Sequence, residues 1–186
     1  MKRQAKILIP TALCSDLHAH IFRGTTEQGG FLFADLSQAK GQVVLSATAS
    51  YLVPRSGWER QTGYHLSLRD EERLKVMLMA RERDSHLVEF HSHRGMGPAG
   101  FSVSDTAGLA EVLRYVKWKL PGKMYGAIVW SHMQVAGAVW TSPPDGVMPI
   151  SDVVQIDVSG NPKPLRFADN RALESSVRGW GYRRQK

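Results

Sequence analysis

A buried strand followed by a helix is predicted where the chain reads HLVEFHSH (86–93) and then SDTAGLAEVLRYVKWK (104–119). The first segment has the length and the apolar centre of a strand. In the second, Ser104 and Asp105 lead into a helix predicted from 106 to 119. Its apolar residues recur at helical spacing and share one face: Leu109, Val112, Leu113 and Val116.

Strands and helices are interspersed along the rest of the chain. Further strands are predicted at 6–9, 31–34, 43–49, 125–130, 135–140 and 153–158, and further helices at 17–24 and 70–84. This order favours an α/β fold in which helices sandwich a mixed β-sheet. We expect one domain over residues 1–159, followed by a basic C-terminal extension over 160–186.

The bulk composition is that of an ordinary globular protein, with 186 residues, 42% hydrophobic and 22% charged. A single cysteine, Cys14, excludes an internal disulfide and a zinc site built from several thiolates. Near the N-terminus, Pro10 interrupts the apolar run too early for a targeting signal. No stretch approaches the roughly 20 apolar residues of a membrane span. We therefore expect a cytoplasmic protein that has no membrane partner.

Most of the formal net charge of +7 lies in the C-terminal extension, where seven Lys and Arg face two acidic residues between 160 and 186. Such a segment is a solvated tail, a docking segment for an acidic partner, or a nucleic-acid contact. No zinc finger, helix-turn-helix or RNA-binding signature accompanies the charge, which argues against nucleic acid.

His91 and His93 have the spacing of a metal site on a strand. Side chains two residues apart on a strand point the same way, so these two imidazoles can converge on one ion. Asp105, at the start of the next helix, can supply a third ligand, which leaves the fourth position of a tetrahedral zinc site open. The pair His18 and His20 has the same spacing, but on a helix two residues turn about 200° and point apart.

The arrangement His91-x-His93, eight intervening residues, then Ser102-x-x-Asp105 resembles the JAMM motif of the MPN/JAB-domain metalloproteases. That family also carries a glutamate after its first helix, and Glu27, before Gly29-Gly30, matches its position. The resemblance covers roughly residues 7–140 and implies the cytidine-deaminase-like MPN/JAB fold. Arg94 stands where a proline often follows the second histidine, and the spacer is about one residue longer than in many eukaryotic members. Both departures point to a prokaryotic branch.

The resemblance implies a role for each matched residue. His91, His93 and Asp105 would bind Zn²⁺, and Glu27 would act as general base and acid on the zinc-bound water. Ser102 would hydrogen-bond the oxyanion or the water. Glu89 is the rival base, because it shares the strand face of the histidines.

By the same resemblance, the function would be that of a deubiquitinase-like zinc isopeptidase or peptidase. It would cleave after the C-terminal glycine of a ubiquitin-like protein, in lysine conjugates or precursors, with activating or conjugating enzymes of the same pathway as further partners, for example in antiphage defence. The loop 53–63 and the insert 94–101 are expected to wall the substrate groove. Two alternatives stay open: a peptidase acting on cell-wall or phage-tail material, and a non-catalytic MPN scaffold.

Overall fold

The protein is described here by a computed structural model, which covers residues 4–39, 42–95, 97–143, 145–157 and 159–165. In chain order its elements are β1 (Ala5–Pro10), α1 (Thr11–Ile21), β2 (Gly29–Ala39), β3 (Gln42–Leu52), η1 (Arg55–Gly57), β4 (Trp58–Gln61), β5 (Leu66–Leu68), α2 (Asp70–Glu82), β6 (His86–Ser92), α3 (Val103–Lys119), β7 (Tyr125–Trp130), β8 (Val135–Ser142), β9 (Asp145–Ile156) and β10 (Pro162–Pro164).

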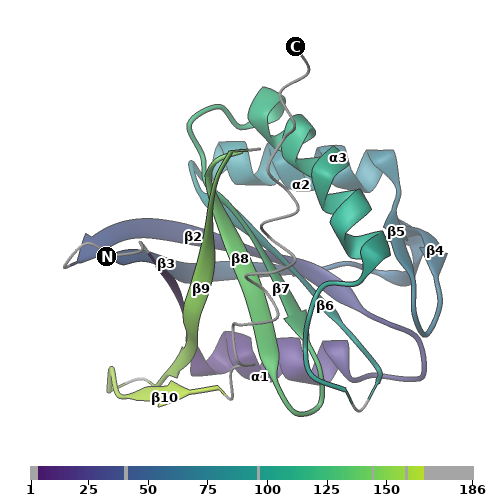
Figure 1. Ribbon diagram of the computed structural model, residues 1–186, viewed down its shortest axis with the longest axis horizontal. Coiled ribbons are helices and arrows are strands. Elements are labelled where there is room, and N and C mark those ends of the chain that lie inside the picture. Colours follow the sequence, from purple (N-terminus) through teal and green to yellow (C-terminus); the bar gives the residue numbers. More distant parts are fainter. Residues whose placement is uncertain (1–3, 40–41, 96, 144, 158, 166–186) are drawn as a thin grey trace.

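Seven strands form a closed barrel, in the order β1-β3-β2-β6-β7-β8-β9 (Figure 1). The barrel closes because β1 pairs in parallel with β9 as well as with β3. β6 and β7 are also parallel, and the other neighbours in the barrel are antiparallel. The expected helix-sandwiched α/β sheet of the MPN/JAB fold is therefore wrong: the described part of the chain is mostly β, with a closed barrel and three α-helices.

The inside of the barrel is one apolar core. Inward side chains from all seven strands meet there, and α1 adds Cys14, Leu17 and Ile21 to the same cluster. In Figure 1, α1 lies across one end of the strands. A helix at the end of a barrel buries its apolar face against the interior residues that strands alone leave uncovered.

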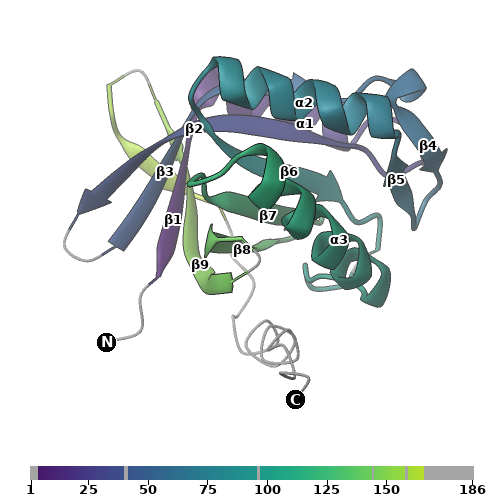
Figure 2. The same cartoon turned by 90° about the horizontal axis from the view of Figure 1, so that it is seen from above.

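A second apolar core lies outside the barrel. Here α2 and α3 pack on one outer face of the sheet, over Phe33, Leu87 and Trp140 among others (Figure 2). All six residues of β7 are buried, because one face of this strand looks into the barrel and the other lies under helices. Strands buried on both faces also occur in open α/β sheets, which is the physical reason for the wrong fold expectation.

Several element boundaries also differ from the expectations. The helix predicted from residue 17 begins at Thr11, directly after Pro10. Ser15 therefore lies inside the helix, and its hydroxyl donates a hydrogen bond to the Thr11 carbonyl oxygen. The predicted loop at 53–63 contains β4, which forms a hairpin with β5. β10 of the expected extension pairs with β9, whereas residues 166–186 lie outside the described part of the chain. Within the described part, no helix combines the length and apolar character needed to cross a bilayer.

The tight approach of β8 to its neighbours generates a stability prediction. A Cβ on Gly137 would lie 2.5 Å from the Ala127 carbonyl oxygen and 2.6 Å from Ile150 Cδ1. Gly137→Ala should therefore lower the free energy of unfolding by about 1–3 kcal/mol, measured by urea denaturation. Gly108→Ala is the control, because nothing lies within 4 Å of its Cβ. There the better helix propensity of alanine should add up to about 1 kcal/mol. Equal stability of the two variants would contradict this packing.

Candidate metal centre

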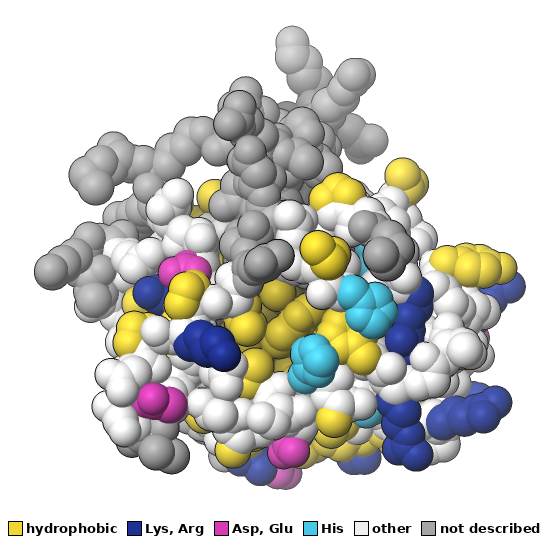
Figure 3. Space-filling view, turned by 90° about the horizontal axis from the view of Figure 1, so that it is seen from below, with side chains coloured by type: hydrophobic (Ala, Val, Ile, Leu, Met, Phe, Trp, Pro, Cys, Tyr) yellow, Lys and Arg dark blue, Asp and Glu magenta, His cyan; other side chains and the backbone are white. Residues whose placement is uncertain are grey.

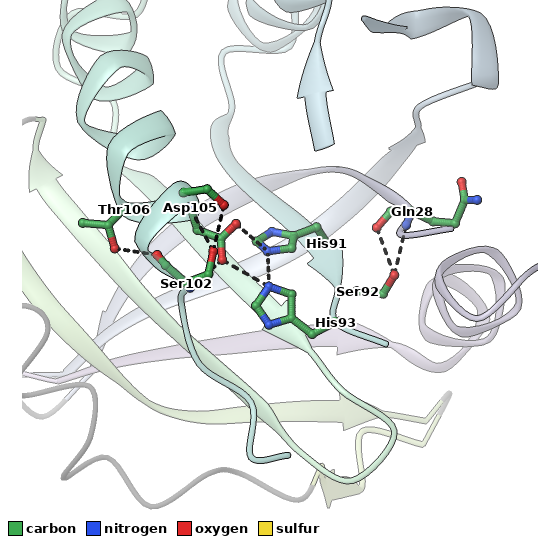
Figure 4. A network of polar contacts seen from close by, with 8 residues as sticks. Gln28, His91, Ser92, His93, Ser102, Asp105 and Thr106 are labelled. Atoms are coloured by element: carbon green, nitrogen blue, oxygen red, sulfur yellow. Dashed lines mark hydrogen bonds and ion pairs between the residues drawn. The ribbon is translucent and has the colours of Figure 1, made fainter. Parts of the chain in front are cut away.

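The two histidines of the site lie at the end of β6. Their period-two spacing directs both rings to one side, with the two Nε2 atoms 3.2 Å apart (Figure 4). The His93 amide donates to the Trp130 carbonyl, so the pairing with β7 continues past the last residue of β6. The strand backbone therefore holds both imidazoles in place.

Asp105 reaches the histidines from the first turn of α3. A capping box fixes it there: the Ser102 amide donates to Asp105 Oδ2 at 2.7 Å, and the Asp105 amide donates to Ser102 Oγ at 3.1 Å. Its Oδ1 lies 3.4 Å from His91 Nε2 and its Oδ2 lies 3.1 Å from His93 Nε2. The structure thus brings together the three side chains that the sequence predicts as ligands.

These three side chains fit a tetrahedral metal. Zinc bonds of about 2.0–2.1 Å place neighbouring ligand atoms about 3.3 Å apart, close to the separations found here. Burial by itself would raise the pKa of Asp105, but hydrogen bonds from His91 and His93 hold it well below its ordinary value. The carboxylate is therefore ionised, as a ligand must be. Two imidazoles and one carboxylate suit zinc better than calcium or magnesium.

Glu27 lies beside the three ligands without joining them. It is only 5% exposed, in the loop between α1 and β2. No described residue hydrogen-bonds its carboxylate, and the cluster of candidate ligand atoms in the described chain leaves it out. Burial raises the pKa of the Glu27 carboxyl, while the charges of His91 and His93 oppose that shift. A carboxyl held close to the ligands but outside their shell suits proton transfer better than ligation.

Ser102 and Glu89 have contacts of their own. Ser102 is the exposed N-cap of α3, and its Oγ lies 3.0 Å from Ser104 Oγ. Its hydroxyl therefore holds Asp105 in place, and its expected catalytic role stays a prediction. Glu89 accepts a hydrogen bond from the Tyr125 hydroxyl and stands outside the ligand cluster.

A cavity of about 430 Å³ opens beside the ligands and includes His91 and Asp105 in its lining. The β4–β5 hairpin, α2, α3 and the sheet enclose it. Two of its lining donors, Trp58 Nε1 and Arg73 Nε, are buried without a hydrogen-bond partner in the described chain. Of the two predicted walls, the loop 53–63 contributes Trp58, and no described residue of 94–101 lines this cavity. The only sequence signal for the missed hairpin was the apolar alternation at Leu66 and Leu68.

A second hollow of about 520 Å³ lies on the α1 side of the protein, where apolar and histidine side chains meet (Figure 3). His18 and His132 line it, together with Cys14. The other histidine of α1, His20, turns away and its Nε2 lies 3.1 Å from the Gly29 carbonyl oxygen. The pair on the helix therefore diverges, as predicted, and the hollow has no metal-ligand cluster among the described residues.

Comparisons with known proteins bear on the fold alone. No family model matches the chain, and no curated protein matches it. Its structure is similar to the solution structure of protein DSY2949 from Desulfitobacterium hafniense, with a TM-score of 0.52 and 16% sequence identity. The similarity covers 81% of this chain and 93% of the other.

The ligand geometry predicts that the purified protein holds about one zinc per chain. The double variant His91→Ala/His93→Ala should lose it, because a single carboxylate cannot retain the ion. Elemental analysis after dialysis measures the metal content. The control is His18→Ala/His132→Ala, which removes the same number of imidazoles from the second hollow. Zinc that stays in the first variant and leaves the second would place the metal elsewhere.

Proposed function

We propose that this protein is a zinc-dependent hydrolase of peptide or isopeptide bonds. The observation that carries the proposal is the convergence of His91, His93 and Asp105, with the buried Glu27 beside them. His91 and Asp105 also line a cavity. The order and spacing of these residues resemble the JAMM motif, which supports the same reading.

Each residue of the centre has a task in this reaction. Zinc, when bound, supplies a Lewis acid that polarises a carbonyl and lowers the pKa of water. Glu27 accepts a proton from the attacking water, whose oxygen adds to the substrate carbonyl, and passes that proton to the amine that leaves when the C–N bond breaks. Burial raises the pKa of Glu27, which suits a group that must do both. Ser102 Oγ accepts a hydrogen bond from the Asp105 amide, so its hydroxyl hydrogen can turn either to Ser104 Oγ or to an oxyanion.

The cavity is the proposed substrate site. A buried donor that lacks a partner costs free energy, which a substrate oxygen placed against it would offset. Trp58 Nε1 and Arg73 Nε are two such donors in the described chain, on residues that line the cavity. Both atoms are shielded from solvent, so a substrate carbonyl would reach them only after these side chains shift. The cavity therefore favours a substrate that carries hydrogen-bond acceptors, such as a peptide chain, over a hydrocarbon.

Within peptide substrates, we propose the C-terminal tail of a ubiquitin-like protein, joined to lysine or to a precursor extension. This choice rests on the motif resemblance. A peptidase that acts on cell-wall or phage-tail material would use the same centre and would differ from this proposal only in its substrate. A non-catalytic scaffold has no need of three converging ligands and a buried glutamate, so the complete set favours an enzyme. Docking through the basic extension concerns mainly residues 166–186, which lie outside the described part of the chain.

Glu27→Gln separates catalysis from metal binding. The change keeps the size of the side chain and removes proton transfer, so turnover should fall about 100- to 10,000-fold while zinc content stays the same. Glu89→Gln is the comparison, because Glu89 is the other glutamate near His91. Glutamine can still accept the Tyr125 hydroxyl, so turnover should fall far less. Full activity in Glu27→Gln would refute the proposed mechanism.

The substrate class is tested with a ubiquitin-like fusion that ends in Gly-Gly before a reporter. Cleavage is expected after the last glycine, and replacing that glycine with valine should block it, because the valine side chain would collide with the walls of a groove that holds the extended tail. Gel electrophoresis and mass spectrometry identify the cleaved bond. Equal cleavage of both fusions, or cleavage of cell-wall peptides alone, would show that the substrate class is wrong.

A further inference from the structure

The end of β6 presents different side chains to two sides. His91 and His93 direct their rings to the ligand cluster. Ser92 and Arg94 alternate with them and contact the segment 22–28, which carries Glu27. One strand end therefore holds the metal ligands and the loop of the proposed acid/base at the same time.

Arg94 makes an unusually complete set of contacts with that loop. Its Nε and Nη2 donate to the Thr26 carbonyl at 3.1 and 2.9 Å. Nη1 donates to the Phe22 carbonyl at 3.3 Å, and Nη2 donates to the Arg23 carbonyl at 2.7 Å. A planar guanidinium can serve three carbonyl groups at once, whereas the single ammonium of lysine cannot match that fork.

Two of these carbonyls lie where α1 ends. Phe22 is the C-cap of the helix, and carbonyl oxygens at a helix C-terminus lack intrahelical partners and carry partial negative charge. A cation stabilises this end. Arg94 therefore ties the end of α1 to the residue directly before Glu27.

Glu27 is held on both sides. After it, the Gln28 amide donates to Ser92 Oγ at 3.0 Å, and the Ser92 amide donates to the Gln28 carbonyl at 2.9 Å. Before it, the Thr26 carbonyl is held by Arg94. The Glu27 amide itself donates to the Thr62 carbonyl at 2.7 Å. Ser92 and Arg94 lie at and just after the end of β6, beside His91 and His93 in the chain. Their contacts therefore set the distance between Glu27 and the candidate ligands.

We propose that Arg94 is a positioning residue that holds the Glu27 carboxylate at the metal centre through the carbonyls of Phe22, Arg23 and Thr26. The inference rests on the proposed function for its effect on turnover. It explains why arginine stands at a position where the JAMM motif often has proline: proline has no side-chain donor and cannot hold the loop.

Arg94→Ala, Arg94→Lys and the wild type are compared in cleavage of the Gly-Gly fusion. Arg94→Ala should lower kcat about 10- to 100-fold and leave KM and zinc content nearly unchanged, as removing a supporting contact around a catalytic group does. Arg94→Lys should recover part of kcat, because one ammonium can still reach one of the carbonyls. Arg81→Ala is the control, since it removes the same charge from an exposed position of α2.

Amide hydrogen exchange supplies a readout that does not require activity. In Arg94→Ala the amides of Glu27 and Gln28 should exchange at least several-fold faster, while those of β7 in the barrel keep their protection. If these two amides exchange faster in Arg94→Ala but the wild type cleaves nothing, the positioning role is supported and the proposed function is rejected. Unchanged kcat, or unchanged exchange of these two amides, in Arg94→Ala would overturn the inference. Should Arg94→Ala fail to fold, the same two measurements on Arg94→Lys decide it.

Discussion

The register of β6 between its two neighbours is the constraint on which the site depends. His91 pairs with Gly29 of β2 on one side and with Val129 of β7 on the other. The pairing with Gly29 brings the chain just before β2, and with it Glu27, beside the first histidine. A shift of one residue would turn both imidazoles to the opposite face. The positions of the candidate metal ligands His91 and His93 and of the buried glutamate therefore depend on one set of backbone hydrogen bonds.

Glycine is required for this close approach. A Cβ on Gly29 would lie 2.8 Å from the Phe90 carbonyl oxygen and 3.3 Å from His91 Cβ, with the Trp58 indole 3.2 Å away. A larger residue would push β2 away from the histidine or displace the wall of the cavity. Because Gly29 has no side chain, β6, the loop that carries Glu27 and the β4–β5 hairpin can meet there.

The position of the third candidate ligand, Asp105, depends on the capping box at the start of α3. Asp105 is the N3 residue of a capping box, so its carboxylate stabilises the start of α3 while it faces the two histidines. Helix capping and the proposed metal binding use the same side chain. Ser102 completes this arrangement from the other side of the box, which gives it a structural role whatever its part in the chemistry.

The sequence by itself determined the features that depend on local periodicity. Alternation on one strand predicted that His91 and His93 share a face, and a helix start predicted where Asp105 would stand. Helical spacing likewise predicted that His18 and His20 diverge. Most central strands were found for the same reason, although the helix start at Thr11 and the short strands β4 and β5 were missed.

Tertiary structure decided the rest: closure of the barrel through β1 and β9, the cavity walled by Trp58 and Arg73, and the contact of Arg94 with the loop of Glu27. Each of these joins segments far apart in the chain, and periodicity within one segment carries no information about which distant segment will pair with it.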